Sequence, residues 1–156
     1  MILIAHRGNY NSVQPDRENT LSYLHEAISR GYDVEVDIRL TNKGFMLGHD
    51  DPRYPITMAE IQELSRRTWF HAKNYEALVT LTKEGHHVFA HNQDLWTLTS
   101  RNVIWSHKHQ SNPNGIVCMP NFEVDIDIIK TAKGVCHDRL DYIENILKFG
   151  VVSQKE

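Results

Sequence analysis

The chain has 156 residues, of which 40% are hydrophobic and 24% are charged, and its formal net charge is −3. This length suits one domain spanning residues 1–156 with a buried core, and the small charge excludes a global attraction to nucleic acid or anionic membrane. The N-terminus lacks a signal-peptide pattern and no segment holds the roughly 18 apolar residues of a membrane span, so we expect a cytoplasmic protein.

In the first half of the chain, apolar runs of strand length alternate with segments of helical spacing. Residues 33–40 show this most clearly, because valine and isoleucine alternate there with acidic residues at the period of a strand. Polar residues 9–17 predict a loop. We expect strands at 1–5, 33–40, 45–50 and 68–73, and helices at 18–30, 58–66 and 74–84.

The second half continues the pattern with shorter elements. We expect strands at 86–92, 114–121 and 133–138, two short strands within 95–107, and helices at 124–132 and 140–149. Alternating strands and helices indicate an α/β class with a largely parallel sheet. A complete (β/α)8 barrel takes about 250 residues, so we expect a reduced or distorted TIM-type barrel with several outer helices missing.

Ten histidines are a high count for this length, and many lie where apolar runs end. Barrels of this class place their chemistry at the carboxyl ends of the strands, so these positions are candidates for a site. The histidines concerned are His6, His49, His71, His91, His107 and His137. The two cysteines, Cys118 and Cys136, lie in short apolar runs and are expected to be buried reduced thiols.

Glu35 and Asp37 are two residues apart in a predicted strand, so both side chains point to one face. If that face is the barrel interior, two adjacent carboxylates need a cation, and oxygen ligands favour Mg²⁺ or Ca²⁺. The alternative is the exposed face of an amphipathic edge strand.

Five short motifs in the first 50 residues carry a family resemblance. They are HRG (6–8), ENT (18–20), EVD (35–37), TNKG (41–44) and GHD (48–50). In this order they resemble the glycerophosphodiester phosphodiesterase family, part of the phosphoinositide-phospholipase-like phosphodiesterases. The segment GVCHD (134–138) resembles the last strand of that family, whereas the rest of the second half matches poorly and suggests a compact branch.

The resemblance implies roles for the matching residues. His6 and His49 match the histidines that act as general acid and base on a phosphodiester, and Arg7 matches an arginine that contacts the phosphate. Glu18 matches a glutamate that supports the site, with Asn19 beside it.

The resemblance also implies a divalent metal ion held by Glu35 and Asp37, with Lys73 matching a lysine near the phosphate. His71 stands where the family carries a third acidic ligand, and it is taken here as the third metal ligand. A histidine softens the site, so Mn²⁺ or Zn²⁺ would be tolerated beside Mg²⁺ or Ca²⁺. The alternative for His71 is a core histidine held by a neighbour.

Other polar or aromatic residues at strand ends are candidates for the same pocket. His91 and Trp105 are expected to support the site, although a tryptophan is more often a core residue. His107 and His137 are further pocket candidates. The remaining histidines are expected on the surface, namely His25, His86, His87 and His109.

These observations predict a metal-dependent phosphodiesterase that cleaves a small phosphodiester, with no nucleic acid partner. The alternatives are a non-catalytic phosphate-binding domain and an enzyme acting on a sugar phosphodiester. Whether the product is a cyclic phosphate or the hydrolysed ester stays open, as do the exact substrate and the oligomeric state.

Overall fold

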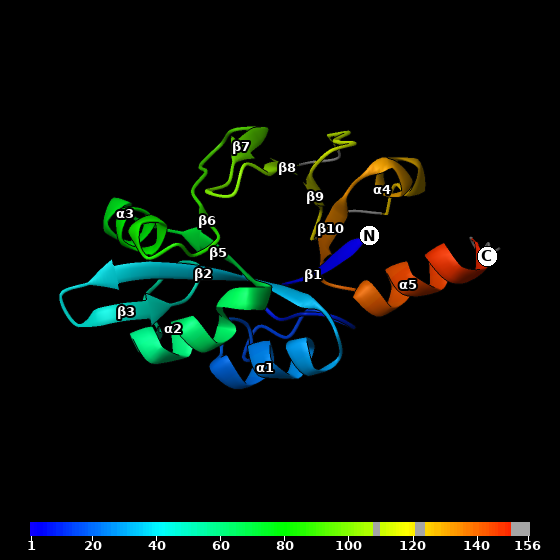
Figure 1. The fold of residues 1–156 in the computed structure, drawn as a ribbon. Helices are drawn as coiled ribbons and strands as arrows, with labels where there is room; N and C mark the ends of the chain where they lie inside the picture. The colour runs from blue at the N-terminus through cyan, green and yellow to red at the C-terminus, as the bar shows by residue number, and fades with distance from the viewer. Residues whose placement is uncertain (108–109, 121–123, 151–156) are drawn as a thin grey trace.

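The computed structural model describes residues 1–107, 110–120 and 124–150 (Figure 1). The strands are β1 (Ile2–His6), β2 (Asp33–Thr41), β3 (Gly44–Leu47), β4 (Tyr54–Pro55), β5 (Thr68–Ala72), β6 (Val88–Phe89), β7 (Trp96–Leu98), β8 (Ile104–His107), β9 (Ile116–Cys118) and β10 (Gly134–His137). The helices are α1 (Leu21–Ser29), α2 (Met58–Leu64), the short 3-10 helix η1 (Ser65–Arg67), α3 (Tyr75–Lys83), α4 (Ile126–Thr131) and α5 (Leu140–Phe149). None of these helices is both long and apolar enough to cross a bilayer.

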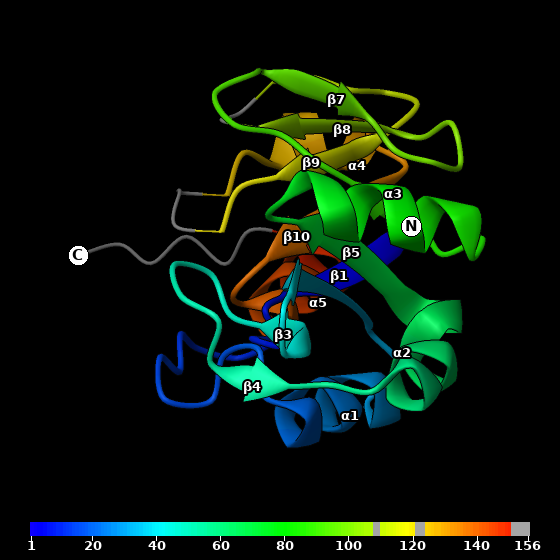
Figure 2. The same cartoon turned by 90° about the vertical axis from the view of Figure 1, so that its left-hand side faces the viewer.

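The ten strands of the described residues belong to one sheet. Eight follow each other in the order β4-β3-β2-β1-β10-β9-β8-β7, and β5 and β6 extend the sheet from the other edge of β2. The pairs among β1, β2, β5, β6, β8, β9 and β10 are parallel, while β3, β4 and β7 pair antiparallel. The sheet curls into a half-barrel (Figure 2). The predicted α/β class is therefore confirmed, and the curl is compatible with a reduced barrel.

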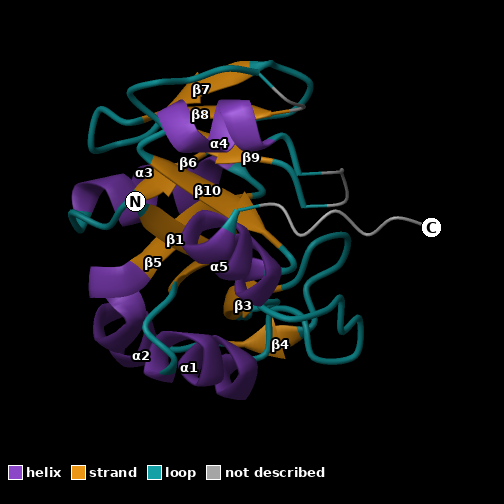
Figure 3. Cartoon of the chain, turned by 90° about the vertical axis from the view of Figure 1, so that its right-hand side faces the viewer, coloured by secondary structure: helices purple, strands orange, loops and turns teal. Residues whose placement is uncertain are grey.

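The alternation in β2 separates the two faces of the curled sheet. Val34, Val36 and Ile38 pack into a cluster with apolar side chains of α1, α2 and α3, which lie outside the sheet (Figure 3). Glu35 and Asp37 point to the inner face. Burial of a valine or isoleucine contributes about 1.5–3 kcal/mol, so the outer face fixes the register that turns both carboxylates inward.

A smaller cluster fills the inner face. Its buried members are Ile4, Trp69, Phe89, Trp105, Ile116, Cys118 and Cys136. Both cysteines are free and buried, as expected from their apolar context. These side chains form an apolar layer beneath the cavity, because most of the next inward-facing residues along the strands are polar.

The barrel is interrupted between β6 and β8. No pairing joins these two strands in the part of the chain that the structure describes, and side chains bridge the seam instead. The ring centroids of Phe89 and Trp105 lie 4.5 Å apart, and those of His91 and His107 lie 3.6 Å apart. Over the described residues between α3 and α4 no helix occurs, which agrees with the expected loss of outer helices.

Several element boundaries differ from the sequence predictions by two or three residues, and one strand was not predicted. The first helix begins at Leu21 rather than residue 18, because Asn19 adopts a positive φ of 61° and turns toward the inner face. The strand predicted at 86–92 keeps only the two residues of β6 in the sheet. The short strand β4 was not predicted, since two residues of an irregular segment carry no periodic signal.

Candidate active site

A cavity of about 480 Å³ opens where the parallel strands end. Its lining combines acidic, basic and aromatic side chains from both halves of the chain. The lining residues are His6, Arg7, Glu35, Asp37, His49, His71, Phe89, His91, Asn92, Gln93, Asp94, Trp105, His107, Cys118 and Pro120. Residues of HRG, EVD and GHD, which are far apart in the sequence, therefore meet at one place.

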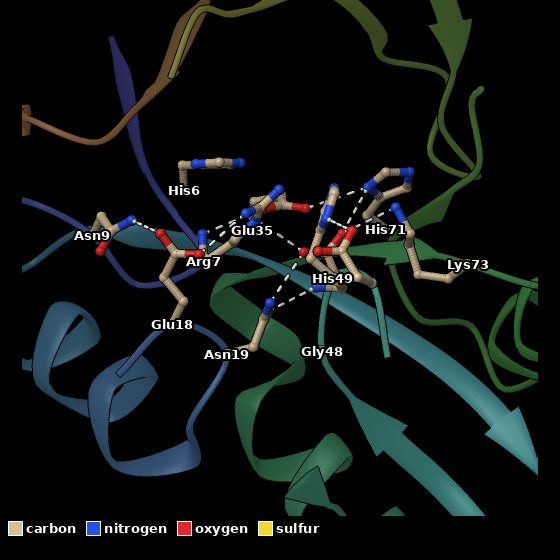
Figure 4. A network of polar contacts seen from close by, with 12 residues as sticks. His6, Arg7, Asn9, Glu18, Asn19, Glu35, Gly48, His49, His71 and Lys73 are labelled. Atoms are coloured by element: carbon tan, nitrogen blue, oxygen red, sulfur yellow. Dashed lines mark hydrogen bonds and ion pairs between the residues drawn. The ribbon is translucent and has the colours of Figure 1, made fainter. Parts of the chain in front are cut away.

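The two carboxylates lie on the cavity floor, and only 3% of Glu35 and 1% of Asp37 is exposed. This burial contradicts the alternative of an exposed edge strand. Oδ2 of Asp37 accepts a hydrogen bond from the Asn19 side-chain amide at 3.1 Å and pairs with Nε of Arg7 at 3.1 Å. Figure 4 shows how Asn19, Arg7 and Glu35 lie in this network. Buried carboxylates are costly unless they are paired in this way.

Cationic groups from β5 and its end complete the neutralisation. Nδ1 of His71 lies 3.1 Å from Oδ1 of Asp37 and 3.6 Å from Oε1 of Glu35, and Nζ of Lys73 lies 3.6 Å from Oδ1 of Asp37. Burial alone would raise the pKa of Asp37, but His71, Arg7 and Lys73 lower it well below its usual range. For His71, burial alone would lower the pKa, but the two carboxylates raise it to about 9.

The same three side chains have the arrangement of a metal site. Glu35, Asp37 and His71 each offer a ligand atom, and these atoms all lie within 4.8 Å of one another. Two carboxylates and one imidazole suit a divalent cation. Oδ1 of Asp37 is buried, and its contacts are the ion pairs with His71 and Lys73. The residues therefore fit the metal ion that the motif order implies.

The turn after β1 fixes Arg7 against this floor. Arg7 has a positive φ of 54°, its backbone N–H donates to Oε2 of Glu35 at 3.2 Å, and Nη1 donates to Oε2 of Glu18 at 3.1 Å. Such a backbone conformation costs energy in a non-glycine residue. A Cβ on Gly8 would lie 3.0 Å from the ring of Tyr23, so the next position favours glycine.

A chain of hydrogen bonds links Glu18 to His6. The amide of Asn9 donates to Oε1 of Glu18 and to Oδ1 of Asp138, both at 2.8 Å, and the same Asp138 oxygen lies 2.8 Å from Nδ1 of His6. Burial would lower the pKa of His6, but the Asp138 hydrogen bond and the charges of Glu35 and Asp138 raise it to about 9. Asp138 therefore orients the ring and stabilises its protonated form.

Sequence reasoning did not assign Asn9 or Asp138 to the site. Both are buried, and their side chains connect β1 to the end of β10, two segments that are 129 residues apart. The signal for Asp138 was its place at a strand end within GVCHD. Asn9 stands directly after HRG, but a polar residue entering a loop gives no signal of its own.

His49 reaches the cavity from the loop after β3. The side chain is 41% exposed, and its Nδ1 lies 2.7 Å from Oδ1 of Asp50. Arg39 holds the loop by donating to the carbonyl oxygens of Gly48 at 3.1 Å and His49 at 2.9 Å. Gly48 has a φ of 139°, and a Cβ there would lie 2.2 Å from the Asp51 carbonyl oxygen. The glycine of GHD is therefore required by backbone geometry.

Among the pocket candidates from the second half, His91, Trp105 and His107 line the cavity and His137 does not. The prediction for His137 is wrong because its neighbour in register is Ala5 of the outer cluster. Nδ1 of His137 accepts a hydrogen bond from the backbone N–H of Arg139 at 2.9 Å.

Two of the four histidines expected on the surface are buried instead. His86 is 2% exposed with Nδ1 at 2.8 Å from Oγ of Ser65, and His87 is 6% exposed with Nε2 at 2.7 Å from Oγ1 of Thr99. Each hydroxyl satisfies a ring nitrogen that burial would otherwise leave unpaired. His25 is exposed as expected, and His109 lies outside the described residues.

No known protein-family model and no curated protein matches this sequence. Among solved structures, the chain is similar to one described as "Crystal Structure of a putative glycerophosphodiester phosphodiesterase from Galdieria sulphuraria", with a TM-score of 0.62. The sequences are 13% identical, and the alignment covers 94% of this chain and 97% of that chain. At this identity the likeness shows the fold, which is the fold that the motif order implies.

Proposed function

We propose that the chain is a metal-dependent phosphodiesterase that cleaves a small phosphodiester, such as a glycerophosphodiester. The observation that carries this proposal is the convergence in one cavity of a carboxylate–imidazole ligand set, two histidines from different segments and an arginine. Phosphodiester cleavage needs these parts, namely a cation on the phosphate oxygens, a base for the nucleophile and an acid for the leaving oxygen. The similar solved structure supports the fold on which they are placed.

Under this proposal Glu35, Asp37 and His71 would hold the metal ion. When bound, a divalent cation polarises the phosphate and neutralises charge on its non-bridging oxygens. The carboxylates favour Mg²⁺ or Ca²⁺, and the imidazole extends the range to Mn²⁺ or Zn²⁺. Arg7 lies beside the ligands and would contact the phosphate through its guanidinium group.

His6 and His49 would carry the protons. Asp138 occupies Nδ1 of His6, so Nε2 is the nitrogen available to the substrate. A carboxylate in this position keeps the imidazole in one orientation and stabilises the imidazolium form. One histidine would take the proton of the nucleophile and the other would protonate the leaving oxygen. The nucleophile, water or a substrate hydroxyl, decides whether the product is cyclic.

The test is hydrolysis of bis(p-nitrophenyl) phosphate and of glycerophosphodiesters with Mg²⁺, Ca²⁺, Mn²⁺, Zn²⁺ or EDTA. We expect activity with at least one ion, loss of activity in EDTA, and a decrease of at least about a hundredfold in His6→Ala. His25→Ala is the matched control, because His25 is an exposed histidine of α1 outside the cavity. Activity that survives in His6→Ala would show that the catalytic groups lie elsewhere in the protein.

A non-catalytic phosphate-binding domain is the second candidate, and one contact favours it. Nδ1 of His71 already lies near both carboxylates, so an imidazolium, with Arg7 and Lys73, can balance their charge without a metal ion. This candidate predicts that phosphate binds in the presence of EDTA and that no ion supports hydrolysis. Isothermal titration with inorganic phosphate, with and without EDTA, separates the two candidates.

A further inference from the structure

The two cysteines lie next to each other on the inner face of the sheet. Cys118 of β9 and Cys136 of β10 are register partners in a parallel strand pair, and both belong to the inner apolar cluster (Figure 1). Neighbouring strands lie about 4.8 Å apart, which is within the Cα separation of roughly 4.4–6.8 Å that a disulfide spans. Both thiols are free. The sheet therefore holds a reduced pair at a spacing that fits a disulfide.

The two thiols differ in their access to the cavity. Cys118 is 7% exposed and is one of the residues that line the cavity, whereas Cys136 is completely buried. Reactive cysteines are partly accessible, and cysteines enclosed by apolar side chains are inert. A small molecule that enters the cavity would therefore meet the sulfur of Cys118 first, and Cys136 would be within reach of that sulfur.

Imidazole groups lie close to the sulfur of Cys118. His107 of β8 is its register partner on the side opposite Cys136, and His6 lines the same cavity from the end of β1. Hydrogen bonding with Cys136 and His107 lowers the pKa of Cys118 in spite of its burial, and the charge of His6 acts in the same direction. Burial and hydrogen bonding with Cys118 raise the pKa of Cys136. The pair thus combines a sulfur that ionises readily with a thiol that keeps its proton.

We propose that Cys118 is a modification site at which a small hydroperoxide oxidises the thiol, and that Cys136 converts the product into a disulfide between β9 and β10. A nucleophilic sulfur at an accessible surface with a second thiol beside it is the arrangement that this chemistry requires. Cys118 has no role in the proposed phosphodiester cleavage, so the state of the thiols tests this proposal without any measurement of hydrolysis.

The reaction has two steps. In the first, the thiolate of Cys118 attacks hydrogen peroxide, so that an S–O bond forms, the O–O bond breaks, and the hydroxide that leaves takes up a proton to become water. Two electrons pass from sulfur to the peroxide. In the second, the sulfur of Cys136 attacks the sulfenic acid, so that the S–S bond forms, the S–O bond breaks, and the departing hydroxide leaves as water with the proton of Cys136.

The native chain tests the whole reaction, because it has two cysteines. Reduced protein is treated with a few-fold excess of hydrogen peroxide, and the remaining thiols are titrated in urea. Intact mass and non-reducing electrophoresis identify the product. We expect both thiols to be lost together in a monomer that is lighter by two hydrogens, and dithiothreitol to restore them. Protein that keeps both thiols, or a product that holds only sulfinic acid or links two chains, would overturn the proposal.

Two matched variants assign the steps to the two cysteines. In Cys136→Ser we expect the reaction to stop at the sulfenic acid of Cys118, which dimedone traps and peptide mass spectrometry locates. In Cys118→Ser the remaining thiol is buried, so we expect it to react with peroxide at least about tenfold more slowly. Equal rates in the two variants would contradict the assignment of Cys118 as the site.

Partial alkylation of the native chain makes the same assignment without a variant. Reduced protein is treated with a limiting amount of iodoacetamide, and the labelled peptides are quantified by mass spectrometry. We expect Cys118 to be labelled at least about tenfold more than Cys136, because it lines the cavity and ionises more readily. Labelling that is equal, or greater at Cys136, would contradict the proposal.

Discussion

Asp138 contributes most to keeping His6 protonated, although it is 132 residues away in the chain. The pKa of His6 is raised to about 9, above its usual 6.5, so the folded state holds a proton that the unfolded chain loses between these values. The pair therefore stabilises the fold below about pH 6.5, and this contribution is lost as the pH rises through 9, at about 1.4 kcal/mol for each pKa unit.

Asp138→Asn removes this charge and tests its effect. We expect the variant to lower the free energy of unfolding at pH 6 more than at pH 9.5, measured by urea denaturation at both values. Asp50→Asn is the control, because it breaks a His–Asp pair of similar length that is exposed and contributes little. An equal loss at both pH values would mean that Asp138 stabilises the fold by packing or neutral hydrogen bonds.

Asp37 is the residue on which the buried charges converge. Arg7, His71 and Lys73 all lie within ion-pair distance of its carboxylate. Asp37→Asn would leave them without their shared counter-charge, so we expect a loss of about 3–5 kcal/mol in the free energy of unfolding. Thermal or urea denaturation measures this loss. Glu63→Gln, an exposed substitution on α2, should change stability by less than about 0.5 kcal/mol.

At the scale of elements, the loop after β3 places His49 through its backbone. Gly48→Ala would put a Cβ 2.2 Å from the Asp51 carbonyl oxygen at a φ of 139°, so the loop must move. We expect a loss of roughly 2–4 kcal/mol in stability and a lower kcat. The measurements are urea denaturation and hydrolysis of bis(p-nitrophenyl) phosphate.

Gly44 offers a matched control for that substitution. It also has a positive φ, 103°, but a Cβ there would meet nothing within 4 Å. Gly44→Ala should therefore show only the backbone cost, on the order of 1 kcal/mol, with kcat unchanged. Similar losses of stability and kcat in both variants would show that the close approach to Asp51 does not position His49.

At the scale of the whole molecule, the proposed metal site connects β2, which carries Glu35 and Asp37, to β5, which carries His71. Paired charges already balance the carboxylates without an ion, so the metal-free chain should fold and the ion should add stability by binding the folded state. A concentration 100 times the Kd adds about 2.7 kcal/mol, or roughly 5–10 °C in Tm for a chain of this size.

Differential scanning calorimetry with Mg²⁺, Ca²⁺, Mn²⁺ and Zn²⁺ measures this shift. Glu35→Gln keeps the size of the side chain and removes one anionic ligand. We expect this variant to lose most of the increase in Tm that the ion causes. No shift with any ion, combined with phosphate binding in EDTA, would favour the non-catalytic candidate.

Local patterns were enough to predict most of the elements and the acidic inner face of β2. Periodicity and helix-boundary residues act over a few neighbours, so the chain itself carries that information. The motif order brought His6, Arg7, Glu35, Asp37 and His49 under consideration, and the structure places them in one cavity. Their chemical roles stay predictions until the variants are measured.

Contacts over long separations decided the rest. Nothing local indicates that Asn9 and Asp138 connect β1 to β10, or that His137 faces outward while Asp138 meets His6, because one residue along a strand reverses the face. The seam between β6 and β8 gathers His91, Trp105 and His107 from segments with weak periodicity. Short patterns specify which way a side chain can point, and only packing of the whole sheet specifies what it meets.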